Sequence, residues 1–170
     1  MGEQAFTRLL VLALLQVVDE VDTGVERTVF FLRLVLEIDV LSWSWGLQAQ
    51  TSLGGGHATG KAVARELRVV KRVDSASTAL MSALRSNEMI TKAVLTMRKA
   101  GKSPLEFLKI TIEQGRVTGL TIEAGDKEGG PEMFENLAFS FNKITVEYVP
   151  QGKDGQPRGS TMFTDQWQQS

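Results

Sequence analysis

Residues 37–46 read EIDVLSWSWG, a segment in which apolar and polar side chains begin to alternate strictly. Leu41, Trp43 and Trp45 share one phase of this alternation, and the serines between them share the other. Successive side chains of a β-strand point to opposite faces, so the pattern is typical of a strand with one buried face. We therefore predict that Leu41, Trp43 and Trp45 belong to the core of a β-rich fold.

The segment before it is strongly apolar. Residues 9–18 read LLVLALLQVV and residues 29–36 read VFFLRLVL, with a polar segment at residues 19–28 between them. This arrangement predicts a hairpin of two buried strands. The alternative is the apolar region of a signal peptide, but Asp19 and Glu20 stand where a small-residue cleavage site is needed. We expect no cleavable signal, and the apolar run is too short to span a bilayer.

Strand-like patterns continue through the rest of the chain, with one helix among them. Residues 78–86 are expected to be helical because Leu80, Met81 and Leu84 fall on one helical face. Residues 74–77 offer capping side chains just before this helix. About eight strands and one helix favour a closed or nearly closed antiparallel barrel. The further expected strands lie at residues 65–73, 93–98, 105–114, 116–124, 136–149 and 161–167.

Two details bear on how the later strands are joined. Gly115 is expected to close a tight turn, which makes residues 105–114 and 116–124 a hairpin. Residues 136–149 change the phase of their apolar side chains, which indicates a bulge or bend near Asn142. Residues 125–131, GDKEGGP, are expected to form a loop.

The charge balance and the residue content exclude several classes of function. The 170 residues carry 19 lysines and arginines against 20 acidic residues, and the net charge of -1 gives no field that would hold a phosphate backbone. We therefore expect no nucleic-acid partner. The chain has no cysteine, which removes disulfides, thiolate metal sites and thiol catalysis.

The glycine-rich segment TSLGGGHATG at residues 51–60 contains the one motif that could suggest a reactive site. Residues 55–62 follow the spacing of a phosphate-binding loop, but Ala62 replaces the hydroxyl residue that would hold magnesium. His57 is the single histidine and has no evident orienting partner or nucleophile. We expect no enzyme activity, no metal and no cofactor. One hypothesis for function is a hydrolase that uses His57 with a nearby serine.

Arg65, Arg68, Lys71 and Arg72 form the densest basic stretch of the chain. No aromatic residues interleave with them, so base stacking is not suggested. One interpretation is an exposed strand edge whose charges discourage unwanted pairing. The other is a subunit contact that meets acidic residues on a neighbouring copy. The sequence supports both equally.

The chain resembles the haemolysin-coregulated protein family, Hcp, the tube-forming component of bacterial type VI secretion systems. EIDVLSWSWG carries the most specific part of the resemblance. The likeness covers residues 37–167, whereas residues 1–36 depart from the family pattern, either as a genuine variant or as a wrongly assigned amino end. The other similar segments are the glycine-rich loop at residues 53–61, the strand at residues 66–74 with the helix after it, KAVLTMRKAG at residues 92–101, LEFLKITIE at residues 105–113 and FNKITVEYVPQ at residues 141–151.

The resemblance implies a single domain over residues 1–170, in which two antiparallel sheets form a small β-barrel with one short flanking α-helix and an extended glycine-rich loop, as in phage tail-tube proteins. It also implies a homohexameric ring that stacks into the inner tube of the secretion system. The implied partners are a VgrG-type spike protein, the contractile sheath and small effector proteins held in the ring lumen. The protein would stay in the bacterial cytoplasm until the sheath contracts and would then be secreted, without inserting into a membrane.

Ring and tube contacts that must later separate are expected to come from polar, flexible loops. The alternative function is a monomeric or dimeric β-barrel that serves as a ligand-binding or effector domain, in which no channel is needed. The residues expected in the contact loops are Ser52, Leu53, Gly54, Gly55, Gly56, His57, Asp126, Lys127 and Glu128.

Overall fold

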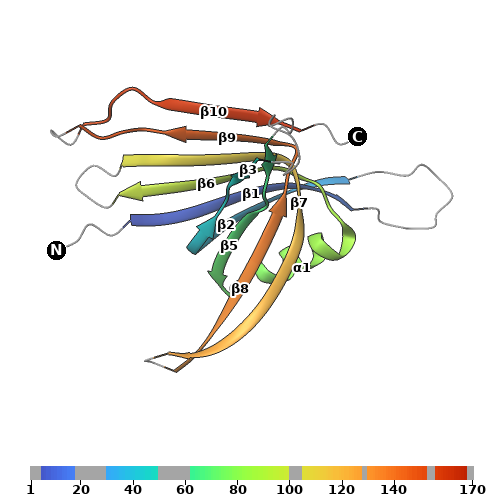
Figure 1. Cartoon of the computed structure of the whole chain (residues 1–170). Coiled ribbons are helices and arrows are strands. Elements are labelled where there is room, and N and C mark those ends of the chain that lie inside the picture. Colours follow the sequence, from blue (N-terminus) through green and yellow to red (C-terminus); the bar gives the residue numbers. More distant parts are fainter. Residues whose placement is uncertain are drawn as a thin grey trace, which may run out of the picture.

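The computed structural model describes residues 5–17, 30–49, 62–99, 105–127, 130–152 and 156–167. The chain is mainly β, with one short helix, as the sequence predicts (Figure 1). In chain order the elements are β1 (Ala5–Val17), β2 (Phe30–Ser44), β3 (Leu47–Gln48), β4 (Val63–Ala64), β5 (Leu67–Arg72), α1 (Ser77–Ser86), β6 (Ile90–Lys99), β7 (Leu105–Lys127), β8 (Gly130–Ser140), β9 (Lys143–Tyr148) and β10 (Thr161–Gln166).

One antiparallel sheet of eight strands makes up most of the molecule. Its strand order is β10-β9-β7-β6-β1-β2-β5-β8, and β8 also pairs with β7. The pairings therefore return to β7 and give a barrel-like arrangement of β7, β6, β1, β2, β5 and β8. β9 and β10 continue outward from β7, and β3 pairs with β4 in a separate two-stranded sheet.

The predicted pairing of the amino-terminal hairpin is confirmed, and the predicted burial of its side chains lies outside the described burial, which begins at Ile38. β1 pairs with β2 from Thr7 opposite Val40 to Val17 opposite Phe30. The other edge of β1 pairs with β6, from Ala5 opposite Lys99 onward. Residues 9–13 of the apolar segment thus lie in β1 between two partner strands, β2 and β6.

The predicted hairpin around Gly115 is wrong, because residues 105–127 form one strand of 23 residues, β7. The backbone at Gln114 has a positive φ of 53°, so the strand bends there and does not reverse. A Cβ on Gly115 would lie 2.7 Å from the carbonyl oxygen of Ser140, which explains the glycine. The predicted irregularity near Asn142 is confirmed, since β8 ends at Ser140 and β9 begins at Lys143.

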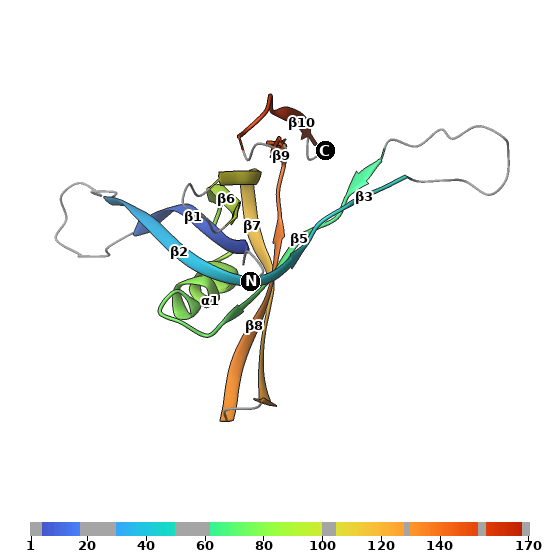
Figure 2. The same cartoon turned by 90° about the vertical axis from the view of Figure 1, so that its left-hand side faces the viewer.

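Because of the bend, β7 pairs with two groups of strands. Its first half pairs with β6 and β9, and its second half pairs with β8. The predicted loop at residues 125–131 is shorter than expected, because Asp126 still pairs with Pro131 and Lys127 with Gly130. We call residues 120–127 and 130–137 the arm; this part of the β7–β8 hairpin projects from the body of the molecule (Figures 1 and 2).

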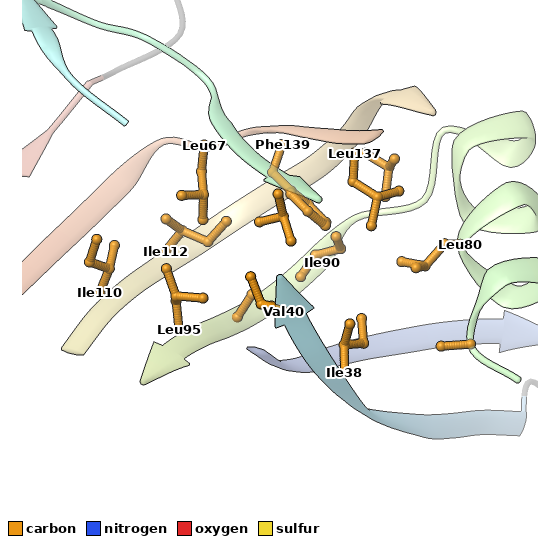
Figure 3. Packing of buried hydrophobic residues seen from close by; sticks show 14 of the residues in the cluster. Ile38, Val40, Leu67, Leu80, Ile90, Leu95, Ile110, Ile112, Leu137 and Phe139 are labelled. Atoms are coloured by element: carbon orange, nitrogen blue, oxygen red, sulfur yellow. The ribbon is translucent and has the colours of Figure 1, made fainter. Parts of the chain in front are cut away.

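The core lies between the strands of the barrel-like sheet and is built from aliphatic side chains and Phe139 (Figure 3). Trp43 and Trp45 are partly buried and pack against it, but the prediction for Leu41 is wrong, because 46% of Leu41 is exposed. The pairing of β2 with β5 shifts register between Val40 and Ser42. This bulge changes the phase of the alternation, so that Val40 faces the core before it and Trp43 after it.

The helix confirms the predicted position and apolar face. Leu80 and Ala83 of α1 are buried, and Figure 3 shows Leu80 directed toward the core cluster. The expected side-chain cap is absent, because the N-cap residue is Ala76. In its place, Asp74 Oδ1 accepts a hydrogen bond of 2.8 Å from the Ala76 amide, and Ser77 Oγ accepts one of 3.0 Å from the Asp74 amide. These bonds hold the turn between β5 and α1.

Substituting Gly115→Ala should destabilise the fold by about 1–3 kcal/mol, because the new methyl group collides with the β8 backbone. Gly46→Ala is the matched control, since a Cβ at Gly46 has no atom within 4 Å. We expect that control to stay within about 0.5 kcal/mol of the unsubstituted chain. Chemical denaturation followed by tryptophan fluorescence measures both, and equal free energies of unfolding for the two variants would contradict the bend as described.

Candidate assembly surfaces

The basic residues of β5 and its flank divide between the surface and the interior. Arg65, Arg68 and Arg72 are exposed and each meets a polar neighbour. The distances are 2.7 Å from Arg65 to the Gln48 side chain, 3.6 Å from Arg68 to Glu66 and 3.4 Å from Arg72 to Glu132. β5 pairs with β2 on one side and β8 on the other, so the interpretation of these residues as an exposed sheet edge is wrong.

Lys71 does not belong to this surface, which corrects its assignment as a contact residue. Its side chain is completely buried because it lies in phase with Leu67 and Val69, the two core residues of β5. The ammonium group lies 2.7 Å from Glu135 Oε2 and 2.8 Å from Asp74 Oδ1. It also donates hydrogen bonds to the Arg72 carbonyl oxygen and to Ser77 Oγ. The alternation of β5 could have identified Lys71 as inward, since a lysine in phase with two aliphatic residues signals a buried ion pair.

Lys71→Met should destabilise the fold by about 3–5 kcal/mol, because it leaves the buried Glu135 carboxylate without its cation. The double variant Lys71→Met with Glu135→Leu should recover a large part of that loss, since no buried charge is then left unpaired. Arg72→Met, at the exposed neighbouring position, serves as the control. Denaturation midpoints measure all three, and a double variant no more stable than Lys71→Met would contradict the pairing.

A shallow groove lies between β5, β7 and β8 on the outer side of the sheet. Small residues, Gly119 and Ala138, form part of its lining, together with Arg68, Glu66 and Glu123. Thr118 Oγ1 donates a hydrogen bond of 2.7 Å to Glu66. The groove thus carries charge of both signs, and its described lining contains no histidine, lysine or cysteine.

Two carboxylates on the sheet surface, Glu106 and Glu113, are engaged in ion pairs. Arg98 forms a hydrogen bond of 2.9 Å to Glu106 through Nε, and this bond lowers the pKa of Glu106 below its ordinary value. Glu113 pairs with Lys143 at 2.6 Å. A general acid requires a raised pKa, so the lowered pKa of Glu106 argues against that role for it. Among the described residues, no group of three or more metal-ligating side chains comes together.

Most of the predicted contact loops lie outside the described residues. These are Ser52, Leu53, Gly54, Gly55, Gly56, His57 and Glu128. Asp126 and Lys127 belong to the end of β7 and therefore to the arm. The predicted loop contacts stay a prediction.

Large apolar side chains are exposed at two ends of the molecule, a feature that the sequence analysis missed. Ile122 and Met133 lie on the arm, and Tyr148 and Phe163 lie on β9 and β10. Figures 1 and 2 are related by a turn about the vertical axis, and both place β9 and β10 at the top and the arm at the bottom. A monomeric surface seldom keeps grouped apolar side chains without a partner, so these two ends are candidate contact surfaces.

Comparison with known proteins identifies the family. The family model described as type VI secretion system effector, Hcp, matches residues 35–148. The chain belongs to the Hcp family. It is 36% identical over 126 residues to protein hcp1 of Pseudomonas aeruginosa, a match that covers 72% of this chain and 76% of that protein.

Solved structures of Hcp proteins share the fold. The Hcp1 crystal structure from Salmonella typhimurium has a TM-score of 0.64 at 24% identity, covering 96% of this chain and 94% of that one. A type VI secretion system effector from Yersinia pestis has a TM-score of 0.60 at 22% identity, covering 96% and 99%. The share of this chain that these structures cover is larger than the part, residues 35–148, that the family model matches.

Membership places the chain in type VI secretion, as the sequence resemblance predicts. Hcp proteins are secreted structural components and are not a known enzyme family. No helix among the described residues is both long enough and apolar enough to cross a membrane.

Proposed function

We propose that this Hcp chain is the tube subunit of a type VI secretion system. Copies form a homohexameric ring, and rings stack into an inner tube that the contractile sheath expels behind a VgrG-type spike. Small effectors travel in the lumen. The chain acts as a single domain over residues 1–170, without catalysis, and moves from the bacterial cytoplasm to the outside when the sheath contracts.

The observation that carries this proposal is a pair of open sheet edges. Within the described residues, β10 pairs with β9 alone, and residues 116–127 of β7 pair with β8 alone. An open strand edge presents unpaired backbone groups that natural proteins cover or blunt. These two edges belong to different strands, so they suit a head-to-tail contact between copies, the type of contact that closes into rings.

The competing function is a monomeric or dimeric β-barrel that binds a ligand or acts as an effector domain. The groove between β5, β7 and β8 is the feature that favours it. Its lining offers charges of both signs and no converging set of hydrogen-bonding groups around an apolar pocket, which is what a small-molecule site usually has. The proposed function as a tube subunit therefore explains more of the surface features than a ligand-binding domain does.

The native mass of the purified chain tests the proposal. Size-exclusion chromatography with light scattering should give six times the subunit mass of 18.7 kDa, and negative-stain images of the same peak should show annular particles. A monomer or dimer at all concentrations, with no rings in the images, would favour the competing function.

The glycine-rich loop is proposed to contribute to contacts between rings. Deleting Gly54, Gly55, Gly56 and His57 should leave the melting midpoint of the ring unchanged and reduce the growth of stacked tubes, because the described pairings of the barrel-like sheet form between other residues. Electron microscopy of tubes formed at high protein concentration measures the stacking. Tubes of unchanged length would show that the loop is dispensable for it.

A further inference from the structure

β9 and β10 extend beyond the core, so part of their core-facing side is exposed to solvent. We call these two strands the flap. Ile110 of β7 lies opposite Val146 of β9, which lies opposite Phe163 of β10, so the three side chains form one row across the sheet. Exposure rises along this row, from 2% at Ile110 through partly buried Val146 to 41% at Phe163. Tyr148, in the next row, is 48% exposed.

The flap presents these aromatic rings on a fixed support. At the end of β10, the Trp167 amide donates a hydrogen bond of 2.7 Å to the Asn142 carbonyl oxygen. The Trp167 ring packs edge-on against Phe141, with a centroid distance of 5.9 Å. Side chains that are already ordered lose little conformational entropy when a partner covers them.

The arm repeats the same arrangement at the other end of the molecule. On its core-facing side, Leu120 lies opposite Leu137, Ile122 opposite Glu135, and Ala124 opposite Met133. Exposure again rises with distance from the core: Leu137 is 2% exposed, Ile122 44% and Met133 55%. The buried ion pair of Glu135 with Lys71 joins this part of β8 to β5, which fixes the position of the arm where it leaves the body of the molecule.

We infer that the core-facing side of the arm of one copy covers the core-facing side of the flap of the next copy in the ring. The occupant of each apolar face is thus a second copy of this chain. This inference rests on the proposed ring, because it assigns the lateral contact on which the ring depends. Arm on arm or flap on flap would give a two-fold dimer and end assembly there, whereas arm on flap repeats around a ring.

The flap offers an apolar centre for such a contact. Tyr148 and Phe163 together leave roughly 150–200 Å² of aromatic surface open, given the 150–250 Å² that an aromatic side chain can bury. A standard interface buries about 800 Å² on each partner, with an apolar centre and a polar rim. The aromatic pair would supply roughly a fifth to a quarter of that area. The open backbone edges of β10 and of residues 116–127 lie on the same two elements, beside the two apolar faces.

Cysteine cross-linking tests the inference directly, because the chain has no cysteine of its own. The variant Phe163→Cys with Ile122→Cys is assembled, treated with a short bismaleimide and separated under denaturing conditions. We expect a ladder of covalent multimers that ends at the hexamer. Each single variant alone should stay monomeric, and an equal mixture of the two should give no species larger than a dimer.

The matched control is Thr164→Cys with Ile122→Cys. Thr164 is exposed on β10 next to Phe163, but it points to the opposite face of the flap. We expect at least a tenfold lower yield of multimers from this control at equal reaction time. All variants change exposed positions, and light scattering before cross-linking confirms that each one still forms the ring.

The outcomes distinguish a failure of this inference from a failure of the proposed function. A normal ring mass with no ladder, or with equal ladders from the Phe163 and Thr164 pairs, overturns the arm-on-flap contact and leaves the ring standing. Dimers from Phe163→Cys alone would also overturn it, because they indicate flap on flap. Absence of a ring from the unsubstituted chain would contradict the proposed function and this inference together.

Discussion

β7 belongs to both halves of the molecule, and the rest of the fold depends on the bend that makes this possible. At Gln114 and Gly115 the strand changes direction while its hydrogen bonding continues, first with β6 and β9 and then with β8. The close approach of the Ser140 carbonyl to Gly115 leaves no room for a side chain. Without that bend, β8 could not pair with both β7 and β5, and the strands would form an open sheet with no enclosed core.

The strands and the helix could be found from sequence wherever apolar periodicity is strong. The amino-terminal hairpin, the helix with Leu80 and the irregularity near Asn142 are all visible in the pattern. In the helix, the pattern reflects which side chains meet the core. The prediction at Gly115 is wrong because a glycine between two alternating segments fits a tight turn and a bend equally well. Only the pairing partners of residues 116–127, which lie far along the chain, distinguish the two.

The errors at Leu41 and Lys71 have related causes. A bulge between Val40 and Ser42 shifts the alternation by one residue, and a single sequence shows no sign of where a partner strand imposes such a shift. For Lys71 the alternation is visible in the sequence, but a charged side chain ordinarily favours exposure, and here it is buried. The candidate contact surfaces on the flap and the arm were missed for the same reason as many interfaces: Phe163 and Ile122 have the pattern of core residues, and only the three-dimensional extent of the core shows that they lie beyond it.

The order of the strands along the chain has a consequence for how the protein folds. The second edge of β1 can be paired only after β6 has been synthesised, since Ala5 lies opposite Lys99. One edge of β5 likewise stays open until β8 has been synthesised, since Arg72 lies opposite Phe134. Folding is slow when contacts join distant parts of a chain, since the entropy of closing long loops is lost before those contacts form. The apolar β1–β2 hairpin therefore emerges from the ribosome well before its partners, and a newly made chain spends its most aggregation-prone interval with this hairpin uncovered.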